Sequence, residues 1–333
     1  MVSKQRKRRQ TRTARSGRGS SWSANAQALS EQAGDDQAGE LGTLVAHQGV
    51  AVEVRFDDPK QPRRMVRVRR RSGHVVGDRV EVVGERLRRL ERRNELRRAD
   101  ALGKVHTVAA NLDVLGIVVA PVPVAPAGFV DRALVSAAAA GIEPFLLVNK
   151  ADLPGADETL AALRGIYEPL GLALFSVSAA SGAGLEALRA YFSAGEDGRR
   201  GAFVGTSGVG KSSLLNALLP ELELGVGEIN EFSGLGRHTT TTATLHVLPD
   251  GGELIDTPGF RDFGLVDVTV VELTRFFPGF AAILQGQPCR FSDCRHLVEP
   301  DCAILSAVAE DRLGRDRWQR YHDLVAEVAA GVR

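Results

Sequence analysis

The sequence predicts a multidomain protein with a small N-terminal β-barrel, a central α/β domain and a helical C-terminal domain that holds a cysteine cluster. Three observations support this. Residues 41–98 contain short, mostly β-branched runs separated by turn signals. From about residue 101, apolar strands alternate with helical segments. All three cysteines lie within Cys289–Cys302. We expect the barrel over 41–100, the α/β domain over 101–265 and the helical domain over 266–333.

The composition is typical of a soluble globular chain, with 44% hydrophobic and 25% charged residues. No segment has the apolar length of a membrane span, and the N-terminus lacks the apolar core of a signal peptide. Three cysteines cannot all pair as disulfides, which fits a reducing compartment. We therefore expect a cytoplasmic protein without a membrane partner, and we expect it to act as a monomer.

The net charge of +1 is unevenly distributed. Residues 1–20 hold eight lysines or arginines and no acidic residue, and small polar residues follow. We expect residues 1–40 to form a disordered basic tail. Two interpretations of the tail stay open: a solvated segment without a partner, or an arm that binds RNA phosphates.

The predicted barrel is rich in arginine. Its strands are expected near Leu44–Ala46, Val50–Phe56, Met65–Arg69 and Arg79–Val83. A run of charges is usually a solvated face, but here arginines recur on a predicted strand and just beyond the barrel, which favours nucleic-acid binding. Aromatic residues for base stacking are scarce, so structured RNA, bound by its backbone or shape, is the expected partner. The arginines are Arg63, Arg64, Arg67, Arg69, Arg70, Arg71, Arg86, Arg88, Arg89, Arg92, Arg93, Arg97 and Arg98.

A nucleotide-binding pattern lies in the middle of the chain. Gly205–Ser212 matches the P-loop pattern G-x-x-x-x-G-K-[ST], with an apolar strand expected over Gly201–Val204 and a helix over Lys211–Leu219. This context argues against a mere glycine-rich turn. Lys211 would reach the β- and γ-phosphates, and Ser212 would bind Mg²⁺. We expect nucleotide contacts from Gly205, Thr206, Ser207, Gly208, Val209, Gly210, Lys211, Ser212 and Ser213.

An earlier stretch indicates which base is bound. Val114–Val119 and Pro144–Val148 predict buried strands, with a helix over Asp131–Ala140 between them. The second strand leads into Asn149-Lys150-Ala151-Asp152, the N-K-x-D pattern. The Asp152 carboxylate can accept from guanine N1–H and from the exocyclic amine, a donor pair that adenine lacks. GTP is therefore expected, with base contacts from Asn149, Lys150, Asp152, Ser178 and Ala179, the last two closing a strand predicted over Leu174–Ala179.

Two further segments complete a GTPase set. Gly234–Thr242 contains threonines, of which we expect Thr240 to bind Mg²⁺. Asp256-Thr257-Pro258-Gly259 matches D-x-x-G, in which Asp256 would hold Mg²⁺ and the Gly259 N–H would contact the γ-phosphate. Because the base-reading loops precede the P-loop, the order is circularly permuted, which a doubly wound sheet tolerates. The chain after Gly259 would then lead directly into the helical domain, as a tether that reports loss of the γ-phosphate.

The residue that orients the attacking water is less evident. Many GTPases place a glutamine directly after D-x-x-G, but this position is Phe260, which cannot form a hydrogen bond through its side chain. His238 is the candidate in its place, acting beside the charge of Lys211. A plain surface histidine is an equally open interpretation of His238.

The C-terminal cysteines have the spacing of a metal site. Cys289, Cys294, His296 and Cys302 give three thiolates and one imidazole, a closed tetrahedral set typical of structural zinc. The alternative is three buried free cysteines and a surface histidine, which the tight spacing disfavours. Leu313–Val332 predicts a helix whose apolar stripe packs against this lobe.

Together these motifs resemble those of the circularly permuted GTPases of small ribosomal subunit biogenesis, the RsgA family. The resemblance covers about residues 41–310 and also includes Ala109-Ala110-Asn111-Leu112-Asp113 and Gly236–Thr241. It implies an OB-like barrel, a permuted GTPase domain and a zinc domain. It also implies late maturation of the 30S subunit, binding to that particle and its rRNA, and GTP hydrolysis that the particle stimulates and that leads to release. The alternatives are a translation-factor or signalling GTPase and an RNA-binding switch that only holds GTP.

Overall fold

The computed structural model describes residues 39–99, 103–220, 243–257, 265–266 and 268–330. Met1–Gly39 and Glu40–Arg333 form separate units, and the elements of the fold belong to the second. The basic tail, His238, Thr240, Gly259 and Phe260 lie outside the described residues, as does the tether after Gly259. Among the described residues, no helix has both the length and the apolar composition that crossing a bilayer requires.

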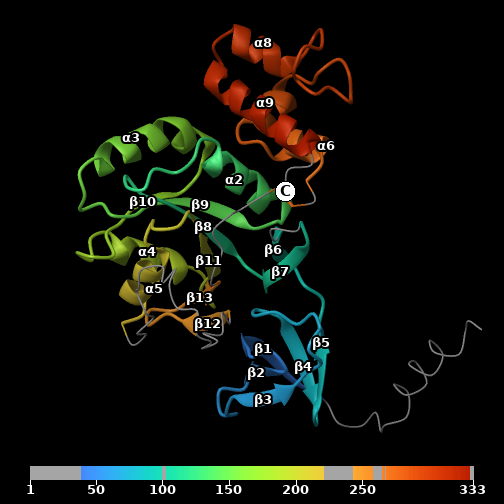
Figure 1. Cartoon of the computed structure of the whole chain (residues 1–333), viewed down its shortest axis with the longest axis vertical. Coiled ribbons are helices and arrows are strands. Elements are labelled where there is room, and N and C mark those ends of the chain that lie inside the picture. The colour runs from blue at the N-terminus through green and yellow to red at the C-terminus, as the bar shows by residue number, and fades with distance from the viewer. Residues whose placement is uncertain (1–38, 100–102, 221–242, 258–264, 267, 331–333) are drawn as a thin grey trace, which may run out of the picture. The chain divides into compact units, whose positions relative to one another are not determined.

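An antiparallel barrel forms the first part of the described chain (Figure 1). The predicted strands are present with small shifts of their ends, and their alternating buried residues include Leu44, Val52, Val54 and Val80. A fifth strand pairs with β4 over residues that we expected to follow the barrel. The strands are β1 (Glu40–His47), β2 (Ala51–Phe56), β3 (Arg64–Arg67), β4 (Arg79–Val83) and β5 (Arg86–Arg89).

The central sheet has the strands expected of a GTPase, and it continues into the barrel. Its order is β10-β9-β8-β11-β13-β12-β1-β2-β3; the strands from β10 to β13 in this order are parallel, and β12 is antiparallel. The junction pairs Ala46 of β1 with Thr244 of β12. The strands are β8 (Val114–Val119), β9 (Glu143–Val148), β10 (Leu174–Ser176), β11 (Arg200–Val204), β12 (Thr244–Val247) and β13 (Glu253–Asp256).

Helices cover both faces of this sheet (Figure 1). On one face, α2 and α3 pack on Leu115 and Ile117 of β8. On the other, α4 and α5 pack on Val114 and Val118 of the same strand, which is therefore buried along its whole length. The helices are α2 (Phe129–Ala139), α3 (Ala156–Tyr167), which ends in the short helix η1 (Glu168–Leu170), α4 (Leu185–Phe192) and α5 (Lys211–Leu218).

A two-stranded hairpin links the barrel to β8. It consists of β6 (Glu95–Ala99) and β7 (Val105–Ala110), which pair antiparallel in a sheet of their own. An isolated bridge joins Val76 of the barrel to Ala109 of β7. We had not predicted this hairpin, because its strands are short and the first is rich in arginine.

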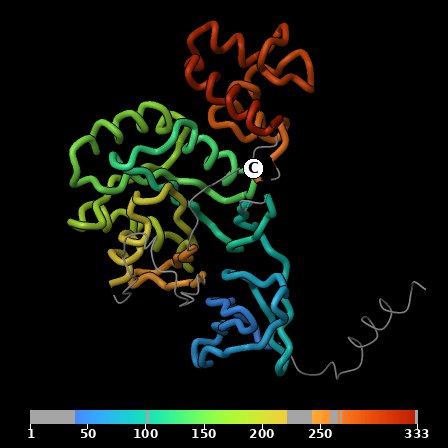
Figure 2. The backbone as a smooth tube through the Cα atoms, in the orientation of Figure 1, coloured from blue at the N-terminus to red at the C-terminus, as the bar shows by residue number. Residues whose placement is uncertain are grey.

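The last four described helices form the cysteine-bearing lobe, seen at the red end of the tube in Figure 2. Phe277, Phe280 and Tyr321 are fully buried at its centre, and Val135 of α2 belongs to the same apolar cluster. The lobe therefore shares its core with a helix of the GTPase domain. Its helices are α6 (Val270–Phe276), α7 (Phe280–Gly286), α8 (Ala303–Ala309) and α9 (Arg315–Ala329).

Candidate functional site

The P-loop connects the end of β11 to the start of α5. Gly208 and Gly210 have φ values of 81° and 93°, in the left-handed region that glycine tolerates. A Cβ on Gly210 would lie 2.4 Å from Nδ2 of Asn149, so the close approach of the two loops also requires glycine. The Lys211 ammonium donates to the carbonyl oxygens of Gly205 at 2.6 Å and Thr206 at 3.0 Å. The lysine thus reaches back across the loop whose N–H groups would bind phosphates.

The magnesium ligands expected from the sequence are only partly described. Ser212 lies in the first turn of α5, and Asp256 is the last residue of β13. Burial raises the pKa of Asp256, and the charge of Lys211 partly offsets this, so the two groups are electrostatically coupled. The register of β11 and β13 pairs Ala202 with Ile255, which brings the ends of both strands to one edge of the sheet. A hydroxyl and a carboxylate at this edge are oxygen donors that suit Mg²⁺.

The two base-reading loops meet the P-loop through one side chain. Asn149 is 1% exposed, donates through Nδ2 to the carbonyl oxygen of Val209 at 2.8 Å, and accepts from the Ala179 N–H at 3.3 Å. Ser178 donates its hydroxyl proton to Asp152, which orients that carboxylate. Lys150 is held separately, by a 2.7 Å bond from Nζ to the carbonyl oxygen of Val122. The structure thus brings together the residues that the sequence separates into three motifs.

The barrel's arginines divide into two groups that the sequence could not distinguish. Eight of them pair with carboxylates: Arg55, Arg63, Arg64, Arg79, Arg88, Arg92, Arg93 and Arg97. Six exposed ones have no carboxylate partner among the described residues, and we call them the basic surface: Arg67, Arg69, Arg70, Arg71, Arg86 and Arg89. A hollow of about 360 Å³ is lined by both β3 and the β4–β5 turn, so these parts of the surface adjoin.

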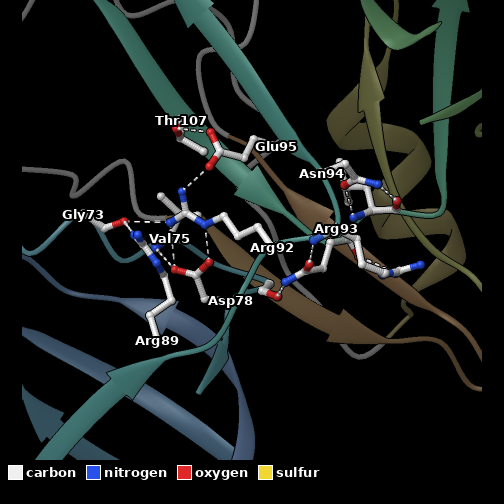
Figure 3. A network of polar contacts seen from close by, with 12 residues as sticks. Gly73, Val75, Asp78, Arg89, Arg92, Arg93, Asn94, Glu95 and Thr107 are labelled. Atoms are coloured by element: carbon white, nitrogen blue, oxygen red, sulfur yellow. Dashed lines mark hydrogen bonds and ion pairs between the residues drawn. The ribbon is translucent and has the colours of Figure 1, made fainter. Parts of the chain in front are cut away.

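Arg92, which the sequence places among the arginines that favour nucleic-acid binding, is held by groups of the protein itself (Figure 3). Its guanidinium bonds to the fully buried Asp78 at 2.6 Å and 2.9 Å, to Glu95 at 2.8 Å and to the Gly73 carbonyl oxygen at 2.7 Å. Its side chain is only 10% exposed. Burial alone would raise the pKa of Glu95, but Arg92 and Arg97 outweigh it and lower the pKa to about 2. The network fastens β6 to the barrel.

Asn111 and Asp113 join three segments at the start of β8. Asn111 donates to the Gly77 carbonyl oxygen at 2.8 Å and accepts from the Arg93 N–H at 2.8 Å. Asp113 accepts from the Arg200 N–H at 2.8 Å and pairs with the Arg93 guanidinium. A Cβ on Gly77 would lie 2.1 Å from the Ala110 carbonyl oxygen, so this approach depends on glycine. In the sequence, the motif that contains Asn111 and Asp113 contributes only to the resemblance. In the structure, its hydrogen bonds connect the barrel to the start of β8 and to β11.

The cysteine cluster is compact. Cys289, Cys294, His296 and Cys302 present ligand atoms that all lie within 4.8 Å of one another. Three sulfurs and one imidazole nitrogen at this spacing suit tetrahedral zinc. Burial raises the pKa of the Cys294 thiol to about 12, so a cation would have to displace its proton on binding. Trp318 fixes the loop by donating to the His296 carbonyl oxygen at 2.7 Å.

Two adjacent residues of α2, one acidic and one basic, attach the lobe through ion pairs with α9. Asp131, which is 1% exposed, pairs with Arg317 of α9 and accepts from the Tyr167 hydroxyl at 2.9 Å. Arg132 pairs with Glu327 through two bonds of 3.0 Å and 2.7 Å. A lobe held in this way is not connected to the GTPase domain by the tether alone. The sequence offered no signal for these pairs, which join residues far apart in the chain.

Comparisons with known proteins agree with this arrangement. A family model described as RsgA GTPase matches residues 89–266. A small ribosomal subunit biogenesis GTPase RsgA from Pseudomonas fluorescens is 43% identical over 308 residues, 89% of this chain and 88% of the relative. The RsgA GTPase of the same description from Azotobacter vinelandii is 43% identical over 313 residues, which are 90% of this chain and 90% of the relative. Among solved structures, YjeQ from Thermotoga maritima aligns with a TM-score of 0.68 and 30% identity over 87% of this chain and 98% of its own. YloQ, described as a circularly permuted GTPase, aligns with a TM-score of 0.66 and 25% identity, over 91% of this chain and 99% of its own.

Proposed function

The chain belongs to the RsgA family of circularly permuted small ribosomal subunit biogenesis GTPases, and we propose that it acts in late maturation of the 30S subunit, in the cytoplasm and as a monomer. The observation that carries this proposal is that the strands bearing the nucleotide motifs continue, through β12 and β1, into an arginine-rich barrel. We divide the chain into a basic tail (1–40), an OB-like barrel (41–100), a GTPase domain (101–265) and a zinc domain (266–333).

Each nucleotide motif has a separate task in this proposal. Asn149, Lys150, Asp152, Ser178 and Ala179 hold guanine, and residues 205–213 hold the phosphates. The joint held by Asn149 supports this division, because it fixes the distance between the base and phosphate sites. Bound Mg²⁺ would supply positive charge against the β- and γ-phosphates, and its protein ligands are Ser212, Thr240 and Asp256.

Hydrolysis is the attack of water on the γ-phosphorus, which breaks its bond to the β–γ bridging oxygen and releases GDP and phosphate. Lys211 stabilises the charge that develops on the phosphates, and the N–H of Gly259 contacts the γ-phosphate. His238 orients the water, since Phe260 offers no hydrogen-bonding group. An imperfectly oriented water makes the free protein slow, and docking on the small subunit completes the site.

Docking uses the basic surface of the barrel together with the zinc lobe. Exposed arginines without carboxylate partners are the ones free to bind rRNA phosphates, which supports the barrel as the main contact. The zinc, held by Cys289, Cys294, His296 and Cys302, makes the lobe rigid. Loss of the γ-phosphate would release both switch segments, change the angle between the two RNA-binding parts and lower the affinity for rRNA.

Co-sedimentation with purified subunits tests the proposal. We expect binding to 30S with a non-hydrolysable GTP analogue, weak binding with GDP, and no comparable binding to 50S. Equal affinity for 30S in both nucleotide states would contradict release by hydrolysis. Binding to 50S as strong as to 30S would contradict the assignment to the small subunit.

A further inference from the structure

One carboxylate joins the barrel to the strand that leads to the P-loop. Glu253, the first residue of β13, pairs with Arg200 of β11 at 2.6 Å and with Arg55 of the barrel strand β2. Burial alone would raise the pKa of Glu253, but the charges and hydrogen bonds of Arg200 and Arg55 outweigh it and lower the pKa. The carboxylate is 15% exposed, so solvent screens these pairs less than it screens a surface pair.

The position of this triad along the strands matters. Arg200 and Glu253 are paired in register at the amino ends of β11 and β13. At their carboxyl ends, the same two strands deliver the P-loop and Asp256. A slip of one strand against the other would therefore move Asp256 relative to the P-loop. The ion pair at the far end opposes this slip.

The barrel is also linked to the other end of β13, through β12. Asp256 is paired with Thr244 of β12, and Thr244 is paired with Ala46 of the barrel strand β1. The barrel thus reaches β13 at Glu253 through a side chain and at Asp256 through one intervening strand. A charged cleft of about 820 Å³ adjoins the Glu253 contact and is lined among others by Arg55, Asp57, Arg79, Arg200 and Glu253. At this cleft ion pairs add to the contact between the barrel and the GTPase domain, beside the apolar cluster that Leu44 and Val76 of the barrel share with Ile255 of β13.

We propose that Arg55 and Glu253 are positioning residues that couple the barrel to the nucleotide site through β13. When nucleotide and Mg²⁺ fix Asp256, β13 and Glu253 are fixed with it, and Arg55 passes this constraint to β2. By reciprocity, a barrel immobilised on RNA holds β13 in the register that the P-loop requires. Neither residue touches the nucleotide, so the effect is on coupling and not on the site itself.

Arg55→Met tests this coupling, because methionine keeps the length of the apolar stem and removes the charge. The matched control is Arg88→Met, which removes a barrel arginine that pairs with Glu81 of the neighbouring barrel strand. Arg55→Lys serves as the conservative variant. Amide hydrogen exchange of the free protein is measured with and without Mg²⁺ and a non-hydrolysable GTP analogue, and GTP affinity is measured in parallel.

In the wild type we expect the analogue to slow exchange in β1 and β2 as well as in the P-loop. In Arg55→Met the slowing in β1 and β2 should fall by about 5-fold or more, while slowing in the P-loop and GTP affinity remain as in the wild type. Arg88→Met should behave as the wild type, and Arg55→Lys should recover part of the response. A response of β1 and β2 in Arg55→Met equal to that of the wild type, or no response in the wild type, would overturn the proposal.

A second measurement, which rests on the proposed function, compares turnover stimulated by 30S. Arg55→Met should lose most of the stimulation while its affinity for 30S stays near that of the wild type, and full stimulation would contradict the inference. If 30S stimulates none of the proteins, the proposed function fails, whereas the exchange experiment on free protein still decides whether β13 couples the barrel to the nucleotide.

Discussion

The side-chain amide of Asn149 donates to the carbonyl oxygen of Val209 at 2.8 Å and so joins the base-reading loop to the P-loop. The two residues are separated by 60 positions in the sequence, and the base-reading loop comes first. This bond connects two loops that are distant in the sequence, and in the proposed function it fixes the base site relative to the phosphate site.

Asp152→Asn should change the preferred base. The carboxamide no longer accepts two hydrogen bonds from guanine, so GTP affinity should fall by roughly 10-fold or more, and xanthosine triphosphate should bind instead. Fluorescence titration with both nucleotides measures this change. Asp157→Asn, on the exposed side of α3, is the matched control. Unchanged GTP affinity in Asp152→Asn would refute the assignment of Asp152.

Freshly purified protein should contain about one zinc per chain. Cys294→Ser should lose the metal and loosen the C-terminal lobe, because a structural zinc contributes its binding free energy to folding. GTP affinity should be retained, since none of the four residues of the cluster belongs to a nucleotide motif. Elemental analysis and limited proteolysis are the measurements. Zinc-free protein with an intact, protease-resistant lobe would contradict this prediction.

Replacing Arg69, Arg70 and Arg71 with alanine should flatten the salt dependence of 30S binding. Each phosphate that the protein no longer neutralises reduces the number of counterions released, so the slope of log affinity against log salt should fall by about 2 to 3 in magnitude. The control replaces Arg63, Arg64 and Arg88, which are paired with carboxylates. The control should change the slope less. Equal slopes for the two triple variants would place the RNA contact elsewhere.

The network around Arg92 predicts a specific loss of stability in acid. The pKa of Glu95 is lowered from 4.5 to about 2, so its contribution is complete above pH 4.5 and is lost as the pH falls toward 2. Glu95→Gln should therefore cost about 1 to 3 kcal/mol at neutral pH and flatten the decline below pH 4.5. Urea unfolding at several pH values measures this. The control is Glu85→Gln, which changes an exposed carboxylate in the β4–β5 turn and should keep the pH dependence of the wild type. If stability declines in acid as steeply in Glu95→Gln as in the wild type, Glu95 is not the group responsible.

The parts of the fold with a strong local pattern could be predicted from the sequence. β8, β9, β11 and α5 follow from apolar runs and from the glycines of the P-loop, which specify their own backbone conformation. The local sequence does not predict β5 as a strand, since three of its four residues are arginines, and only its pairing with β4 makes it one. Here tertiary pairing overrode local propensity.

The partners of the arginines could not be predicted. Arg92 and Arg69 have the same chemistry in the sequence, yet one is held by a buried carboxylate and the other is exposed without a carboxylate partner among the described residues. Arg55 and Glu253 are 198 positions apart, so their pairing exists only once the sheet has formed. Sequence motifs therefore predict the nucleotide site and identify the compact Cys/His cluster, whereas the connections between the domains required the structure.

The central claim is that the small subunit activates GTP hydrolysis. The most direct measurement is the steady-state rate of phosphate release from GTP with 30S, with 50S and with no ribosomal particle, for the wild type and for His238→Ala. The variant removes only the candidate water-orienting group, so its GTP affinity should stay close to that of the wild type.

We expect slow turnover alone and with 50S, a rate at least 10-fold higher with 30S, and loss of most of that increase in His238→Ala. Full stimulation of His238→Ala would mean that the ribosome, and not His238, orients the attacking water. A wild-type rate that is the same with 30S, with 50S and without a particle would contradict the central claim.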